Sequence, residues 1–285
     1  MKELVIISGK GGTGKTSIVA GLAGVAPELV LADCDVDAAD LHLILHPDVE
    51  QTTDFYSGET PHIDPDSCTS CGVCAEACRF GAISEDIRIQ YEQCEGCALC
   101  SYVCPEKAIT MHPRLCGQWY ISATRFGPMV HASLGIGEEN SGKLVTTVRQ
   151  NAHTLAAERG YEWVLADGSP GIGCPVIASL TNASAVLLVA EPTVSAIHDL
   201  KRVSELTRHF QLPTLAVINK TDVNPELVEE IKTFCHSQSI PIVGSLPYDA
   251  RVTQAQIQGQ SISEYDPQGL GRTMHEIWAQ ITHNV

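Results

Sequence analysis

The sequence of 285 residues is poor in basic side chains and has no long apolar run. Eighteen Lys and Arg stand against 34 Asp and Glu, which gives a net charge of -16. This excess of negative charge opposes broad binding to nucleic acid or to anionic lipid surfaces. No apolar run approaches the roughly 18 residues that a membrane-spanning helix needs. Residues 1–8 lead into a glycine-rich loop rather than a cleavable signal. We therefore expect a cytoplasmic protein with no nucleic-acid partner and no stable membrane insertion.

Cysteine is the unusual component of this composition. The chain has 12 cysteines, whereas its 44% of hydrophobic residues and 18% of charged residues are ordinary for a globular protein. In a reducing cytoplasm thiols are kept from forming structural disulfides. A dense group of cysteines there indicates metal ligation.

Short apolar runs alternate with segments that are long enough to form helices. Strands that are apolar on both faces and alternate with helices are typical of a doubly wound, mostly parallel sheet with helices on each side. The fold class predicted is therefore α/β. The expected strands are residues 4–8, 29–32, 163–166, 185–189, 215–218 and 242–243.

Residues 61–112 differ in texture from the rest of the chain, with eight cysteines, many turn residues and few apolar runs. We interpret this segment as a small inserted α+β domain of bacterial ferredoxin type. Residues 1–60 and 113–285 would then form one discontinuous α/β domain. The flanks of the insert, residues 52–60 and 114–140, are expected to be irregular.

The insert contains the spacing C-x2-C-x2-C-x3-C twice, which is the pattern of two-cluster bacterial ferredoxins. In that pattern the fourth cysteine of each run binds the other cluster. Two 4Fe-4S clusters are therefore predicted. Tetrahedral zinc is the alternative, but it needs only four ligands for each ion and favours separated C-x2-C pairs. The expected ligand sets are Cys68, Cys71, Cys74 and Cys104 for the first cluster, and Cys94, Cys97, Cys100 and Cys78 for the second.

A phosphate-binding loop follows the first expected strand. Residues 9–16 match G-x4-G-K-[ST] between a predicted strand and a predicted helix, which is the context that this motif requires. Backbone N–H groups of such a loop cradle phosphates, Lys15 reaches the terminal phosphates and the Thr16 hydroxyl can bind Mg²⁺. The predicted nucleotide-binding residues here are Gly9, Gly11, Gly12, Thr13, Gly14, Lys15, Thr16 and Ser17.

Lys10 adds a second lysine to the loop. The stretch 10–16 resembles the deviant Walker A box of the MinD, ParA, Mrp and nitrogenase iron-protein superfamily, within the SIMIBI class of P-loop NTPases. The resemblance implies a nucleotide-sandwich dimer, in which Lys10 reaches the phosphates of the partner. It also implies a homodimer or a heterodimer with a paralogous ATPase.

Two acidic segments extend the resemblance. Asp35, after the second expected strand, resembles the acid that orients the attacking water, so Lys10, Lys15 and Asp35 are the expected catalytic residues. Asp167 ends the strand before Gly168 and resembles the Walker B acid that binds Mg²⁺ together with Thr16. ATP or ADP with Mg²⁺ is thus the expected ligand.

The base of the nucleotide is less clearly specified. Asn219-Lys220-Thr221-Asp222 matches N-K-x-D, which reads guanine in GTPases. In MinD-like ATPases the corresponding asparagine contacts adenine, and residues 246–252 resemble their base-proximal segment. We therefore expect ATP, with Asn219, Pro247, Tyr248 and Asp249 near the base, while Asp222 leaves GTP open.

The remaining features are expected to be structural. Cys174 resembles in position a cluster-ligand cysteine of the nitrogenase iron protein, but no second cysteine completes such a site, so a buried thiol is expected. Cys34, Cys116 and Cys235 are expected to be packing residues. Residues 270–281 carry an apolar helical stripe, which predicts a helix docked on the sheet.

Together the residues and the resemblance predict an ATP-hydrolysing protein with two 4Fe-4S clusters, in which nucleotide gates electron transfer to or from a redox or client protein. Two alternatives remain. The chain could be an ATPase that carries or assembles clusters or metals. It could also be a MinD-like positioning switch that binds partners and senses redox state through its clusters.

Overall fold

The computed structural model describes residues 1–135 and 141–285. The chain forms two compact units. Unit 1 comprises Met1–Thr53, Trp119–Ser133 and Ser141–Val285, and unit 2 comprises Asp54–Gln118 and Leu134–Asn140.

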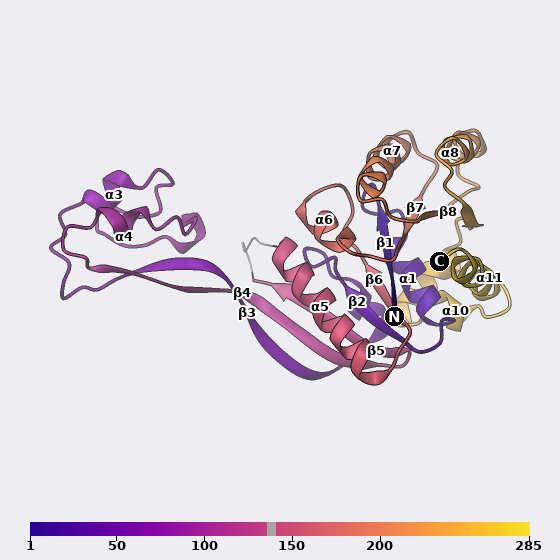
Figure 1. Ribbon diagram of the computed structural model, residues 1–285, viewed down its shortest axis with the longest axis horizontal. Coiled ribbons are helices and arrows are strands. Elements are labelled where there is room, and N and C mark those ends of the chain that lie inside the picture. The colour runs from indigo at the N-terminus through magenta and orange to yellow at the C-terminus, as the bar shows by residue number, and fades with distance from the viewer. Residues whose placement is uncertain (136–140) are drawn as a thin grey trace. The chain divides into compact units, whose positions relative to one another are not determined.

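A mostly parallel sheet organises the fold (Figure 1). Within the described residues its nine strands follow the order β3-β4-β5-β2-β6-β1-β7-β8-β9, and the pairs from β5 to β9 are parallel. All six predicted strands are confirmed. The strands are β1 (Lys2–Ser8), β2 (Leu29–Asp33), β3 (Asp48–Ile63), β4 (Ile109–Thr124), β5 (Gly127–Leu134), β6 (Trp163–Asp167), β7 (Ala185–Ala190), β8 (Thr214–Ile218) and β9 (Ile242–Ser245).

Helices cover both faces of the sheet in unit 1. Successive side chains of a strand point to opposite faces. Leu4 and Ile6 of β1 pack in a core with α1 and α11, whereas Val5 and Ile7 are also fully buried and face the side of α5, α6 and α7. The helices of unit 1 are α1 (Lys15–Ala23), α2 (Leu41–Leu45), α5 (Ser141–Arg159), α6 (Cys174–Leu180), α7 (Val194–His209), α8 (Pro225–Ser237), α9 (Ala250–Ile257), α10 (Ile262–Tyr265) and α11 (Leu270–Asn284).

The C-terminal helix α11 confirms the predicted apolar stripe. Leu270, Met274, Ile277, Trp278 and Ile281 are all buried in the core that also contains α1. The Trp278 ring lies edge-on to Trp163 at the start of β6, with 5.1 Å between the ring centroids. Each large apolar side chain buried in this way stabilises the fold by roughly 1.5–3 kcal/mol.

The prediction that residues 52–60 and 114–140 are irregular was wrong for most of their length. Residues 52–60 lie within β3, residues 114–124 lie within β4 and residues 127–134 form β5; residues 136–140 lie outside the described part of the chain. β3 exposes most of its side chains, whereas most of those of β4 are half-buried, and the two strands contain Gly58, Pro61 and Pro113, which usually mark turns. Backbone hydrogen bonds pair β3 with β4, although neither strand has the continuous apolar run by which a buried strand is recognised in a sequence.

Unit 2 contains the cysteine-rich segment, folded between β3 and β4. Its helical elements are short: α3 (Val73–Ala77), the 3-10 turn η1 (Tyr91–Gln93) and α4 (Leu99–Val103). Cys74, Ile83 and Ile109 form a small core. So few buried apolar side chains supply little stability for a unit of this size.

Candidate functional site

The phosphate-binding loop lies between the carboxyl end of β1 and the start of α1. Gly12 and Gly14 have φ values of +79° and +89°, which a residue with a Cβ atom adopts only with strain. A Cβ on Gly14 would also lie 2.3 Å from Nδ2 of Asn219. Both glycines are therefore required for the loop to wrap closely around a ligand.

Lys15 lies among carboxylates at the base of this loop. Its Nζ is 2.5 Å from Oδ1 of Asp167 and 3.2 Å from Oδ2 of Asp35. Burial alone would lower the pKa of Lys15, but the two carboxylates outweigh burial and raise it. The structure thus brings together three residues that the sequence predicted in the site: Lys15 of α1, Asp167 of β6 and Asp35 of the loop after β2.

Asp33 is a carboxylate of this site to which the sequence analysis gave no role. It ends β2 and is the register partner of Asp167 on β6. Burial and the charge of Asp167 raise the pKa of Asp33 to about 8. Its position at the end of a buried strand was a signal that could have identified it.

The oxygen atoms here fit a hard cation such as Mg²⁺. Oδ2 of Asp33 and Oδ2 of Asp167 are buried and have no hydrogen-bond partner among the described residues. Unpartnered buried carboxylate oxygens are costly unless a proton, a water or a cation satisfies them. Thr16 lines the adjacent cavity together with Asp35. Carboxylate, hydroxyl and water oxygens are the ligands that Mg²⁺ prefers.

Lys10 is held within its own chain. Its Nζ is 2.7 Å from Oε1 of Glu191 and 3.3 Å from Oγ of Ser195. Oε2 of Glu191 is 2.8 Å from Nζ of Lys220, which also donates to the Gly12 carbonyl at 2.8 Å. The sequence analysis missed Glu191, and no motif marks it because only the fold brings β7 beside the loop.

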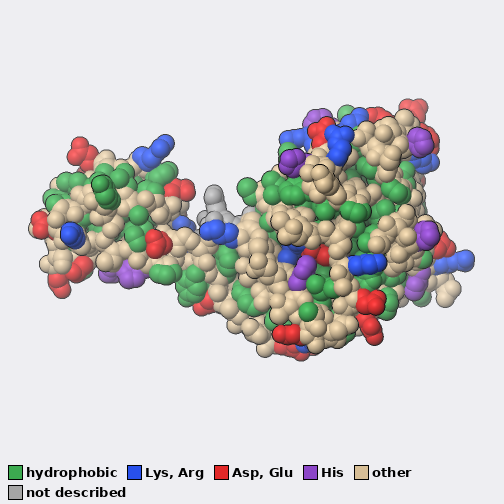
Figure 2. All heavy atoms as spheres, in the orientation of Figure 1, with side chains coloured by type: hydrophobic (Ala, Val, Ile, Leu, Met, Phe, Trp, Pro, Cys, Tyr) green, Lys and Arg blue, Asp and Glu red, His purple; other side chains and the backbone are tan. Residues whose placement is uncertain are grey.

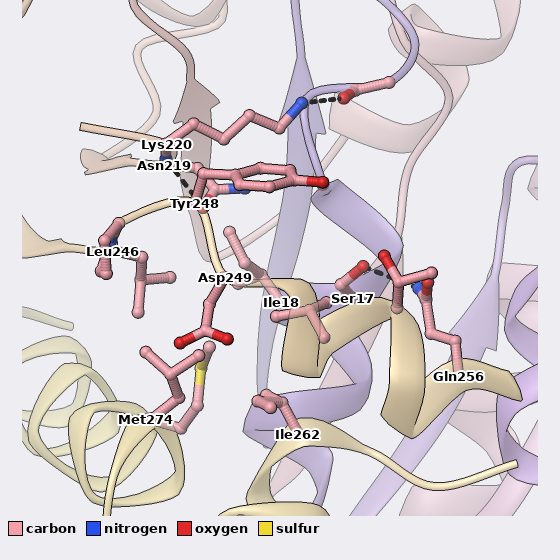
Figure 3. Close-up of a pocket in the computed structure, with 16 residues that line it drawn as sticks. Ser17, Ile18, Asn219, Lys220, Leu246, Tyr248, Asp249, Gln256, Ile262 and Met274 are labelled. Carbon is pink, nitrogen blue, oxygen red and sulfur yellow. Dashed lines mark hydrogen bonds between the residues drawn. The ribbon is translucent and has the colours of Figure 1, made fainter. Parts of the chain in front are cut away.

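A cavity of about 230 Å³ adjoins the phosphate loop (Figure 3). Tyr248 and Asn219 lie on one side of it, and Ile262 and Met274 lie on the other. This apolar slot with polar groups at its edges suits a flat base. Of the predicted base-proximal residues, Asn219, Pro247, Tyr248 and Asp249 all line it. It is also lined by Ser17, Ile18, Leu246, Val252, Thr253, Gln256 and Leu270, most of which the sequence analysis did not assign.

Two contacts fix the wall of this cavity. Nδ2 of Asn219 donates to the Thr13 carbonyl at 2.8 Å, which ties the end of β8 to the phosphate loop. Oδ1 of Asp222 accepts a hydrogen bond from the Tyr248 backbone N–H at 2.5 Å. Asp222 is not among the residues that line the cavity.

The other loop residues are placed as follows. Gly11, Gly12, Thr13, Gly14, Lys15, Thr16 and Ser17 line a second cavity that opens beside Asp35. Gly9 does not line it and instead lies against α7, where an added Cβ would be 2.5 Å from Cβ of Asp199. The loop residues that match the motif are otherwise gathered on one surface.

The eight cysteines of unit 2 line two cavities in the crossed sets. One cavity is lined by Cys68, Cys71, Cys74 and Cys104, and the other by Cys78, Cys94, Cys97 and Cys100. Each cavity thus gathers four thiols, three from one C-x2-C-x2-C-x3-C run and the fourth from the other run. Each cysteine around a cubane binds a different iron, so four thiols around a hollow suit such a cluster.

The expectation of a buried thiol at Cys174 was wrong. Cys174 is exposed and is the first residue of α6, after the N-cap residue Gly173. Cys34, Cys116 and Cys235 are buried, as predicted.

The surface shows mixed charge, and Lys and Arg side chains are interspersed with Asp and Glu on the face drawn in Figure 2. In the part of the chain that the structure describes, no helix has the length and apolar character needed to cross a membrane.

Comparisons with known proteins identify the family of the chain. Residues 4–262 match the family described as the CobQ/CobB/MinD/ParA nucleotide binding domain. Two proteins of Methanocaldococcus jannaschii are similar to this chain. MJ0578 is 35% identical over 225 residues, which cover 78% of this chain and 79% of the relative. MJ0579 is 26% identical over 275 residues, which cover 93% of this chain and 94% of the relative.

Solved structures share the fold. MinD of Pyrococcus furiosus superposes with a TM-score of 0.60 at 18% identity, covering 100% of this chain and 99% of that one. MinD of Aquifex aeolicus in complex with MinC superposes with a TM-score of 0.59 at 17% identity, covering 100% of this chain and 97% of that one. The phosphate loop with its acids and the match over residues 4–262 lead to one conclusion: the chain belongs to the CobQ/CobB/MinD/ParA nucleotide-binding family and is a P-loop ATPase of the MinD/ParA type.

Proposed function

We propose that this ATPase binds two 4Fe-4S clusters in a ferredoxin-like domain and that its nucleotide cycle gates electron transfer through them. The observation that carries the proposal is the lining of the two cavities of unit 2. Each cavity gathers the four cysteines that the crossed ferredoxin rule assigns to one cluster. Chance placement of eight cysteines would not separate them into these sets.

The domain boundaries proposed for the cluster-binding part are residues 61–112. The thiolates of Cys68, Cys71, Cys74 and Cys104 would hold one cluster, and those of Cys78, Cys94, Cys97 and Cys100 the other. Such clusters accept and donate single electrons when bound. The electron would enter from a reduced donor protein and leave to an acceptor protein, so the chain itself undergoes no net redox change.

The ATPase residues would act as follows. Lys15 would neutralise the charge that develops on the terminal phosphate, and Thr16 and Asp167 would hold Mg²⁺. Asp35 would orient the attacking water, which its place beside Lys15 supports. Asn219, Pro247 and Tyr248 would enclose adenine in the cavity beside the loop.

Dimerisation would complete the site, with Lys10 of one protomer reaching the nucleotide of its partner. Methanocaldococcus jannaschii has two different proteins that are both similar to this chain, so paralogues of this family occur together in one organism. A homodimer would use the same surface. Closing and opening of this dimer with ATP binding and hydrolysis is the step that we propose to gate the electron.

The experiment that tests gating is a stopped-flow measurement on anaerobically reduced protein. Transfer of electrons to a one-electron acceptor dye is followed with no nucleotide, with ADP and Mg²⁺, and with ATP and Mg²⁺. We expect the rate to change with ATP in the wild type and to stay constant in Lys15→Ala. Equal rates in all three states of the wild type would refute gating.

A further inference from the structure

The loop that carries Cys94 and Cys97 is fixed to the strands that enclose unit 2. Gly96, between these cysteines, has a φ of +62°, and a Cβ at this position would lie 2.4 Å from the Glu59 carbonyl oxygen of β3. Only glycine allows the loop to approach the strand so closely. The loop therefore rests on the backbone of β3.

Arg114 of β4 makes the second attachment. Its Nη1 donates a hydrogen bond of 2.9 Å to the carbonyl oxygen of Cys94. The guanidinium is half-buried and is charged at every physiological pH. A cation is thus held next to a cysteine that the crossed pattern assigns to the second cluster.

The first cysteine loop is held differently. The Cys68 N–H donates to the Asp64 carbonyl at 3.0 Å, and the Ser70 N–H points to the Cys68 sulfur at 3.4 Å. Both contacts are made by backbone N–H groups of the loop itself, in contrast to the arginine that donates to the second loop. The two cysteine loops therefore differ in their electrostatic surroundings.

We propose that Arg114 is a positioning residue that fixes the Cys94 loop and sets the reduction potential of the cluster bound by Cys78, Cys94, Cys97 and Cys100. This inference rests on the proposed presence of clusters. Reduction adds negative charge to a cluster that is already anionic, and a nearby cation favours the reduced form. Arg114 therefore raises the potential of this cluster relative to the other.

The test is a redox titration followed by EPR on anaerobically purified full-length protein. The variants are Arg114→Gln, which removes the charge, and Arg114→Lys, which keeps it. Arg88→Gln is the matched control, because Arg88 is an exposed arginine of the same unit and lines neither cysteine cavity. Cys71→Ser alters only the first ligand set and identifies which signal belongs to which cluster.

We expect the potential of the second cluster alone to shift downward in Arg114→Gln, to stay closer to wild type in Arg114→Lys and to be unchanged in Arg88→Gln. Loss of half of the iron in Arg114→Gln, with the first cluster retained, would also support the proposal because Arg114 fixes one loop. The proposal would be overturned if Arg114→Gln left both reduction potentials unchanged, shifted both by the same amount, or lost all of its iron. Wild-type protein without any cluster signal would instead refute the proposed function.

Discussion

The ammonium nitrogen of Lys10 lies 2.7 Å from Oε1 of Glu191 in the same chain. The lysine that would act on a partner's nucleotide is thus bound to a carboxylate of its own protomer. Glu191 bonds Lys220 with its other oxygen, and Lys220 donates to the loop carbonyl of Gly12. Glu191 therefore links the phosphate loop to the end of β8, beside the base cavity.

Replacing this carboxylate should ease dimer formation. Glu191→Gln replaces the ion pair with Lys10 by a weaker hydrogen bond. Less free energy is then needed to free Lys10 when two protomers associate. A partly exposed ion pair contributes up to about 1 kcal/mol, which predicts an ATP-dependent dimer about fivefold tighter. Sedimentation velocity at several protein concentrations measures this. The exposed pair Lys201–Glu230 supplies the control Glu230→Gln. An equally large effect of Glu191→Gln in a Lys10→Ala background would contradict the explanation.

Lys15→Ala should abolish ATP turnover and leave both clusters in place. Lys15 contacts the carboxylates of Asp35 and Asp167 in unit 1, whereas the eight cysteines that would hold the proposed clusters all belong to unit 2. We expect a loss of at least about a hundredfold in hydrolysis, because one well-placed cation stabilises the transition state by several kcal/mol. Phosphate release and iron content are the readouts, and Lys232→Ala on the exposed face of α8 is the control. Loss of iron together with activity would show that the two parts do not fold independently.

Unit 1 should lose stability as the pH falls from about 6.5 to 4. Burial, and then the nearby His42, lower the pKa of His131 to about 4 in the folded protein. Its Nε2 lies 2.8 Å from Oγ of Ser122, and its ring stacks on Tyr120. The unfolded chain binds a proton on this histidine below about 6.5 and the folded chain does not, so acid favours unfolding.

The expected loss is about 2–3 kcal/mol near pH 4, from the difference between the two pKa values of His131. Thermal unfolding of the wild type and of His131→Gln across this range measures it. The variant should show a flatter dependence, while the exposed His236→Gln should follow the wild type. The same slope in all three proteins would exclude His131 as the source.

Asp222 should support the nucleotide without selecting guanine. The carboxylate of Asp222 accepts a hydrogen bond from the Tyr248 N–H, which holds Tyr248 in the cavity lining. Asp222→Ala should therefore weaken the binding of ADP and of GDP by a similar factor, about tenfold. Equilibrium binding of both nucleotides measures the two factors. A loss confined to GDP would identify Asp222 as a guanine-reading acid and the chain as a GTPase.

Local patterns predicted much of this protein. The phosphate loop and the strands β1, β2, β6, β7, β8 and β9 follow from contiguous residues, since buried parallel strands are apolar throughout and the loop has a fixed spacing. The crossed cysteine sets were also predicted from spacing alone.

The remaining features depend on contacts between distant parts of the chain. Glu191 is separated from Lys10 by most of the ATPase sequence, and only adjacent strands bring them together. Met274 reaches the base cavity from α11. β3 was missed because most of its side chains are polar and exposed, and β4 because Pro113 and Gly117 interrupt a strand whose apolar residues do not alternate regularly.

The central claim is that nucleotide and clusters are coupled in one protein. Its most direct test is an EPR-monitored redox titration of the anaerobic protein with no nucleotide, with ADP and Mg²⁺, and with a slowly hydrolysed ATP analogue and Mg²⁺. The account predicts two cluster signals and a change in potential or line shape between nucleotide states. Two clusters with identical spectra and potentials in all three states would contradict coupling.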